Sequence, residues 1–193
     1  MATDRFSPLP VVRAHLLALT KRDYSSTTVT ARGYDWVALI ALILIPSLVG
    51  AVAWLLSWRL ATVDALLEGS ALLVGGLIAG FAQIAAWRDR LTAAAQKEGI
   101  AGVSKRDSLD ESVAHTLMAV YAAVVLTVLL AIDANVLAGS GAKGEVTPLS
   151  QLLSSLTLAS SAYLTLLVLL VLANLWSAYS DNNDVPARMG GAE

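Results

Sequence analysis

The stretch LLEGSALLVGGLIAGFAQIAAWRDR, residues Leu66–Arg90, decides the fold class. Its central part, residues 69–87, contains no Asp, Glu, Lys or Arg. An α-helix of this length crosses the roughly 30 Å hydrocarbon core of a bilayer. The stretch ends in a tryptophan and two arginines, which are common at a membrane interface. We therefore predict a membrane-spanning helix here.

Three further charge-free runs indicate that this span is one of several. The chain has 193 residues, of which 56% are hydrophobic and 15% charged, whereas a soluble domain carries about 25% charged residues. The runs do not alternate between apolar and polar residues, as the strands of a membrane barrel would. The sequence predicts an all-α integral membrane protein with four transmembrane helices, at about 36–58, 66–87, 114–136 and 149–179.

The distribution of Lys and Arg predicts the orientation, because cytoplasmic loops are enriched in both. Of the 13 basic residues, only Arg59 and Lys143 lie in the loop after span one or the loop after span three. We expect both termini and the loop between spans two and three to be cytoplasmic. Residues 1–34 would form a cytoplasmic amphipathic segment, residues 35–180 the four-helix domain and residues 181–193 a disordered cytoplasmic tail.

The N-terminal segment contains a short helical pattern over residues 8–22. Leu9, Val12, Leu16 and Leu19 share one face of this predicted amphipathic helix, and basic residues lie off that face. Two interpretations remain open. The helix either lies in the membrane interface, as basic amphipathic segments do, or packs on the cytoplasmic part of its own protein.

Span two is expected to continue beyond the membrane, because helix-forming residues follow it as far as Glu98. Ser108–Glu111 then fits a capping box, so span three should begin before it enters the membrane. The two helices would form a cytoplasmic helical hairpin. This hairpin either contacts another subunit or a ligand, or is only a solvated turn.

Span two carries a polar face. Gly76 and Gly80 are four residues apart and share a helix face with Glu68 and Gln83. Small residues at this spacing let another helix approach closely, so Gly76 and Gly80 predict helix packing. Glu68 and Gln83 are candidates for either a structural role or the lining of a pore.

Span four carries a second polar stripe, formed by hydroxyl side chains within about 100° of arc. Two interpretations remain open, packing against the glycine face of span two or lining of an aqueous path. The stripe comprises Ser150, Ser154, Thr157, Ser161 and Thr165.

Span three contains a carboxylate, Asp133, with Asn135 beside it. Ionisable residues inside a membrane usually face the protein interior or a water-filled cavity. A position at the level of the headgroups is the alternative for Asp133. His115, at the other end of this span, is interpreted as an interfacial hydrogen-bonding residue rather than a proton switch.

Two further features bear on packing and on membrane depth. Pro46 lies within span one and is expected to kink it, because proline removes a backbone donor. The tryptophans that are expected to anchor the interfaces are Trp36, Trp58, Trp87 and Trp176.

The motifs of common catalytic sites are not found in the sequence. It has no cysteine, only two histidines, and no His-Glu-x-x-His, Gly-x-Ser-x-Gly or phosphate-loop pattern. We therefore expect no enzymatic activity, no catalytic residue, no cofactor and no metal site. The net charge of −2 gives no reason to expect nucleic acid as a partner.

The organisation of the first half resembles a known group of proteins. It combines a basic N-terminal helix with VALIALILIPSLVGAVAWLLSW and LLVGGLIAGFAQIAAWRDRLTAAAQ. This pattern resembles the small four-span membrane effectors of bacterial anti-phage and abortive-infection systems, and residues 10–98 resemble the two-helix SLATT group. Spans three and four depart from the two-helix pattern, and no sensor domain is fused. The resemblance implies a multimer that perturbs the membrane when a separate cytoplasmic sensor or trigger protein activates it.

These observations favour a homo-oligomeric membrane channel or pore-type effector, with the lipid bilayer and further copies of the chain as partners. One alternative is a structural or accessory subunit of a larger membrane complex. A less favoured alternative is a small transporter in which Asp133 or Glu68 binds a cation.

Overall fold

The computed structural model describes residues 7–24, 29–58, 60, 63–98, 100–139 and 147–182. In these ranges the elements are α1 (Leu9–Ala18), β1 (Thr20–Tyr24), β2 (Val29–Tyr34), α2 (Trp36–Leu55), α3 (Val63–Glu98), α4 (Ile100–Gly139) and α5 (Pro148–Asn182). Residues 183–193, which make up most of the expected tail, lie outside the described residues.

Four helices are long and apolar enough to cross a membrane, as the sequence predicts, and the other described elements are the short helix α1 and the strands β1 and β2. The candidate spans are Trp36–Leu55, Val63–Arg88, Leu109–Asn135 and Pro148–Ser177.

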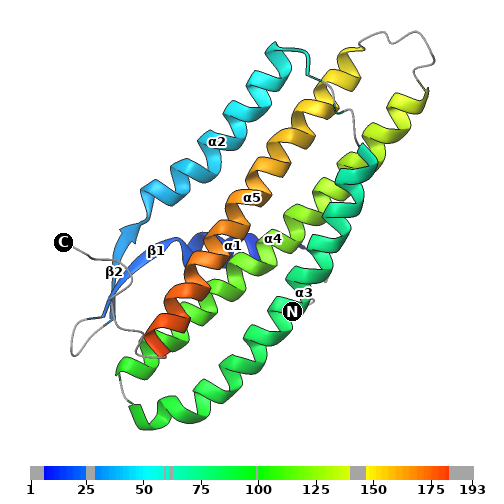
Figure 1. Ribbon diagram of the computed structural model, residues 1–193. Coiled ribbons are helices and arrows are strands. Elements are labelled where there is room, and N and C mark those ends of the chain that lie inside the picture. The colour runs from blue at the N-terminus through cyan, green and yellow to red at the C-terminus, as the bar shows by residue number, and fades with distance from the viewer. Residues whose placement is uncertain are drawn as a thin grey trace, which may run out of the picture.

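The spanning helices form an open row in the order α2–α5–α4–α3 (Figure 1). Helices α2 and α3 are consecutive in the chain but lie at opposite edges of the row. Only 11% of the apolar window of α3 is buried, against 28% for α4 in the interior of the row. Over the described ranges, the row therefore does not close around a lumen.

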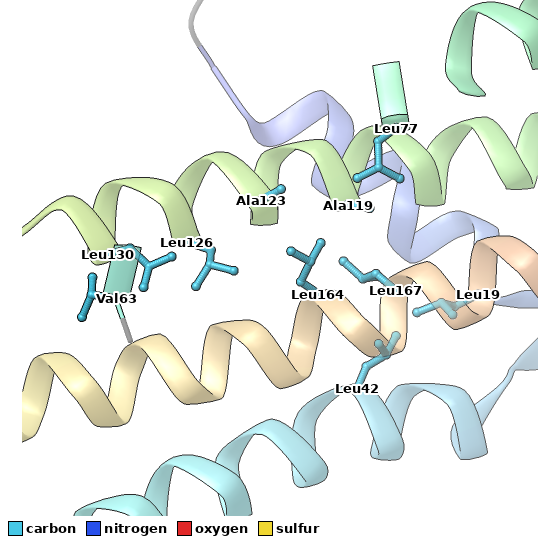
Figure 2. Close-up of a cluster of buried hydrophobic side chains, with 10 residues drawn as sticks. All are labelled: Leu19, Leu42, Val63, Leu77, Ala119, Ala123, Leu126, Leu130, Leu164 and Leu167. Carbon is cyan, nitrogen blue, oxygen red and sulfur yellow. The ribbon is translucent and has the colours of Figure 1, made fainter. Parts of the chain in front are cut away.

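The core lies between neighbouring helices of the row (Figure 2). Ala119 and Ala123 of α4 are fully buried, and their small side chains let the neighbouring helices come close. Larger side chains from all four spanning helices and from the end of α1 fill the space around them. They are Leu19, Leu42, Val63, Leu77, Leu126, Leu130, Leu164 and Leu167.

The contact between α2 and α5 is made by residues that sequence analysis did not single out. A Cβ on Gly50 would lie 3.1 Å from Ala159 Cβ, so only glycine allows this approach without a shift. Pro46 is buried in the same helix, which is assigned as continuous through the proline. At the end of α2, Gln151 Nε2 donates to the backbone oxygen of Trp54.

A small antiparallel hairpin of β1 and β2 joins α1 to α2, where we expected only a linker. The segment is rich in β-branched residues, which favour strands. Gly33 has a φ of +112°, a conformation that other residues rarely adopt. The next turn is closed by Asp35, whose backbone N–H donates to Leu19 O at 2.7 Å and whose side chain caps α2.

The connection between α3 and α4 is shorter than predicted. Helix α3 reaches Glu98, as expected, but α4 already begins at Ile100. The predicted start at Ser108 is wrong, because this residue lies inside the helix. Arg88 and Asp110 form an ion pair between α3 and α4, with Nη2 at 3.2 Å from Oδ2.

Candidate functional site

The face of α3 that points away from α4 consists mostly of small residues. We call this surface the α3 small-residue face. The polar side chains of Glu68 and Gln83 lie toward its two ends, and both are exposed. Its other members, also exposed, are Ala65, Gly69, Leu72, Gly75, Gly76, Ala79, Ala82 and Ala86.

No other part of the described chain covers the glycines of this helix. A Cβ on Gly69, Gly75, Gly76 or Gly80 would meet no atom within 4 Å. The hypothesis that the hydroxyl stripe of span four mates with Gly76 and Gly80 is therefore wrong within a single chain. Gly76 and Gly80 are therefore open to contact with another molecule.

Asp133 lies buried between α4 and α5, and its exposed fraction is 0%. Ser154 Oγ donates to Asp133 Oδ2 at 3.2 Å. Among the described residues, neither Asp133 Oδ1 nor Thr157 Oγ1 has a hydrogen-bond partner, although both atoms are buried. We call Asp133, its partner Ser154, and Thr157 on the next turn of α5 the Asp133 cluster. Asp133 therefore faces the protein interior, two residues before the end of the candidate span Leu109–Asn135.

The hydroxyl stripe of α5 divides into two parts. Ser150, Ser154 and Thr157 are at most 1% exposed. Ser161 is half-buried and donates to Thr157 O at 2.9 Å, while the exposed Thr165 donates to Ser161 O at 2.9 Å. Such bonds to the same helix satisfy a hydroxyl locally. Ser150 Oγ likewise donates locally, to Thr147 O at 2.9 Å, so Ser154 is the stripe residue that, within the described ranges, hydrogen-bonds to another helix.

Asn135 does not join this cluster. Its side chain is exposed, and its Nδ2 donates to Ala131 O of the same helix at 2.6 Å. Farther inside the spans, Ser70 of α3 and Thr127 of α4 have hydroxyl oxygens 3.0 Å apart. Sequence analysis did not single out this second polar contact.

His115 pairs with His15 of α1, and both side chains are buried. Their Nδ1 atoms are 2.8 Å apart, and their rings meet edge to face. One Nδ1 must carry the hydrogen and the other the lone pair, so the two neutral rings hold opposite tautomers. Burial lowers the pKa of His15 from 6.5 to about 4. The fact that the chain has only two histidines was the available signal for this pair.

The position of α1 bears on both interpretations of the amphipathic segment. Helix α1 packs on α4, and its buried side includes His15 with Leu19 just beyond the helix. Leu9 and Leu16, which were predicted to share the apolar face, are 71% and 43% exposed. The helix thus packs on its own protein and still presents leucines outward.

Two apolar cavities lie beside these contacts. One of about 430 Å³ is covered by Pro8 and Val12 and extends to Tyr163 of α5. Another of about 520 Å³ lies between α3 and α5, where Gln83 and Trp87 face Trp176. Gln83 therefore borders both the α3 small-residue face and this second cavity.

The anchor tryptophans lie at or near the ends of the candidate spans. Trp36, Trp58 and Trp176 are exposed, with 62%, 53% and 62% of their surfaces accessible, whereas Trp87 is half-buried.

No family model matches the chain, and searches of curated proteins and of solved structures find no match.

Proposed function

We propose that the protein is a homo-oligomeric membrane channel or pore-type effector in which copies of α3 meet. The observation that supports this proposal is the α3 small-residue face, which carries Glu68 and Gln83 at the open edge of the row. In the part of the chain that the structure describes, the four spans form an open row without a lumen, so conduction would require several copies.

The two edges of the row differ in a way that favours α3 as the contact. The exposed side of α2 carries large apolar residues, which suit contact with lipid tails. They are Val37, Ile40, Ile43, Leu44, Ile45, Leu48, Val52 and Leu55. The exposed side of α3 carries mainly glycine and alanine, which are enriched where helices pack in membranes.

The polar residues of this face support the same arrangement. Glu68 and Gln83 each lie five residues inside the candidate span Val63–Arg88, which is about 7 Å along a helix axis. Polar side chains at such depth are unfavourable against lipid and usually face protein or water. A shared, water-filled lumen between copies of α3 would solvate both side chains.

The orientation and biological setting belong to the proposal as well. The Lys and Arg distribution favours both termini and the α3–α4 turn in the cytoplasm, and the resemblance to bacterial four-span effectors favours the bacterial inner membrane. A role in anti-phage defence, with a separate sensor as trigger, rests only on the resemblance of residues 10–98 to SLATT-type proteins.

The test is to measure ion flux in liposomes and copy number by native mass spectrometry in the same lipid. We expect a defined oligomer that conducts. Gly76→Ile should lower both the oligomer fraction and the flux at least tenfold, because a β-branched side chain separates the helices. Ala173→Ile is the matched control, since Ala173 is an exposed small residue on α5.

Two results would overturn the proposal. One is a monomer without flux, and the other is an oligomer that Gly76→Ile leaves unchanged. Co-purification of a different protein in fixed ratio, lost with Gly76→Ile, would instead assign the face to an accessory subunit.

A further inference from the structure

The Asp133 cluster lies inside one protomer and is separate from the α3 small-residue face. We propose that Asp133, Ser154 and Thr157 bind one small monovalent cation, either a proton or a sodium ion. Cation binding here does not depend on oligomerisation or on conduction through α3.

The first argument is the charge of a buried carboxylate. Asp133 is fully buried and accepts one hydrogen bond from a neutral hydroxyl. An ionised carboxylate in such surroundings requires a counter-charge or several donors. Its Oδ1 atom has neither among the described residues. A bound cation would supply the missing compensation.

The second argument is the unpaired hydroxyl on the facing helix. Thr157 follows Ser154 by three residues, so both side chains lie on the same face of α5. Thr157 Oγ1 is buried without a partner, like Asp133 Oδ1. Buried polar atoms are nearly always paired, so the unpaired Asp133 Oδ1, with an unpaired hydroxyl on the next turn of the facing helix, points to a missing ligand.

The third argument is the chemistry of the donor set. One carboxylate and two hydroxyls are hard oxygen donors, which suit a proton or an alkali cation. A single carboxylate balances one positive charge, which disfavours a divalent ion. Among the described residues, no group of three or more His, Cys, Asp or Glu side chains is placed to hold a metal.

The helices around Asp133 contain few other described groups whose titration could be mistaken for that of Asp133. On α3, the acidic residues nearest this end are Asp64 and Glu68, and both are exposed. The spanning part of α5 has no acidic or basic residue, and its titratable groups are Tyr163 and Tyr179. On α4, the remaining histidine is His115, which lies toward the opposite end.

We expect the bound cation to hold α4 against α5, so that occupancy of the site raises the Tm of the protein. The experiment follows thermal unfolding of the detergent-solubilised protein by the fluorescence of its five tryptophans. Sodium chloride is exchanged for choline chloride at constant ionic strength and pH 8. In a second series, pH is lowered from 8 to 5 in choline chloride. Asp133→Asn, which imitates the neutral carboxyl group, is measured beside the natural sequence throughout.

A sodium site predicts that sodium raises the Tm of the natural protein by several degrees but not that of Asp133→Asn. A proton site predicts that Asp133→Asn is the more stable protein at pH 8 and loses this advantage as pH falls. Comparing both proteins at each pH cancels the titration of the histidine pair. Thr157→Val should weaken either effect.

An infrared measurement keeps the proposal testable if a variant folds poorly. A proton site predicts a protonated-carboxyl band in the natural protein, assigned by isotopic labelling of aspartate. The proposal is overturned if the Tm difference between the natural protein and Asp133→Asn is independent of both sodium and pH. It is likewise overturned if Asp133 is ionised in sodium-free buffer without loss of stability.

Discussion

His15 of α1 and His115 of α4 meet through Nδ1 atoms 2.8 Å apart, although 100 residues separate them in the chain. The contact joins the N-terminal helix to the third span. It requires a donor on one ring and a lone pair on the other. When both rings are protonated, two N–H groups face each other and the hydrogen bond is lost.

We predict that acid releases α1 from α4. The pKa of His15 is lowered from 6.5 to about 4, so docking favours the neutral ring. The stabilisation is complete above about pH 6.5 and is lost as pH falls toward about 4, a change on the order of 3 kcal/mol for this ring. The chain has no cysteine, so spin labels on Leu17→Cys and Val124→Cys can report the distance between α1 and α4. Within four residues of the two histidines, the charged residues in the sequence are Arg13 on α1 and Glu111 on α4.

The control for this prediction is the double variant His15→Phe with His115→Phe, which should dock without pH dependence. Either single variant should be less stable than the double variant by about 1–3 kcal/mol, because one buried nitrogen is left unpaired. An α1–α4 distance that is the same at pH 7.5 and pH 4 would contradict the prediction.

The structure predicts opposite outcomes for substitutions at two glycines. Gly50→Val should destabilise the α2–α5 contact by about 1–3 kcal/mol, because even a Cβ there is 3.1 Å from Ala159 Cβ. Gly75→Val should leave the stability of a single protomer within about 0.5 kcal/mol, because its Cβ would meet nothing within 4 Å. Unfolding in detergent that keeps the protein monomeric measures both. Equal losses at the two positions would argue against the helix order described here.

Neutralising Asp110 should have little effect on stability. The Arg88–Asp110 ion pair connects α3 to α4, but the two side chains are 37% and 42% exposed. Exposed ion pairs contribute about 0–1 kcal/mol, since water screens them. Asp110→Asn should therefore lower the free energy of unfolding by no more than about 1 kcal/mol, with a smaller loss at high salt. A larger loss would mean that the pair is shielded from water in the membrane.

The spans could be predicted because a charge-free apolar run of this length is typical of a membrane-spanning helix. The continuation of α3 to Glu98 was likewise predictable from helix-forming composition. The order of the helices was not, because hydropathy contains no information on which helix packs on which. Gly76 and Gly80 have the spacing of a packing motif, yet Gly50 makes the close contact within the chain. Spacing shows that a helix can be approached closely and leaves its neighbour undetermined.

The candidate site shows the same limit. Asp133 and the hydroxyls of span four were each identified from the sequence. Their meeting depends on the antiparallel register of α4 and α5, which brings Ser154 within 3.2 Å of Asp133. The histidine pair depends on a contact between α1 and α4 across 100 residues of the chain. Local sequence patterns do not record such long-range contacts.

The helix order also determines when each span acquires a neighbour during synthesis. Among the four spanning helices, α2 emerges first from the ribosome. Its packing partner is α5, the last of the spans. Domains made from the N-terminus onward normally pair elements as they appear. Here the first span remains in the lipid without its packing partner until the other spans have been inserted. A nascent chain that stops before Pro148 therefore lacks the helix on which α2 packs, and insertion quality control would meet an unpaired first span.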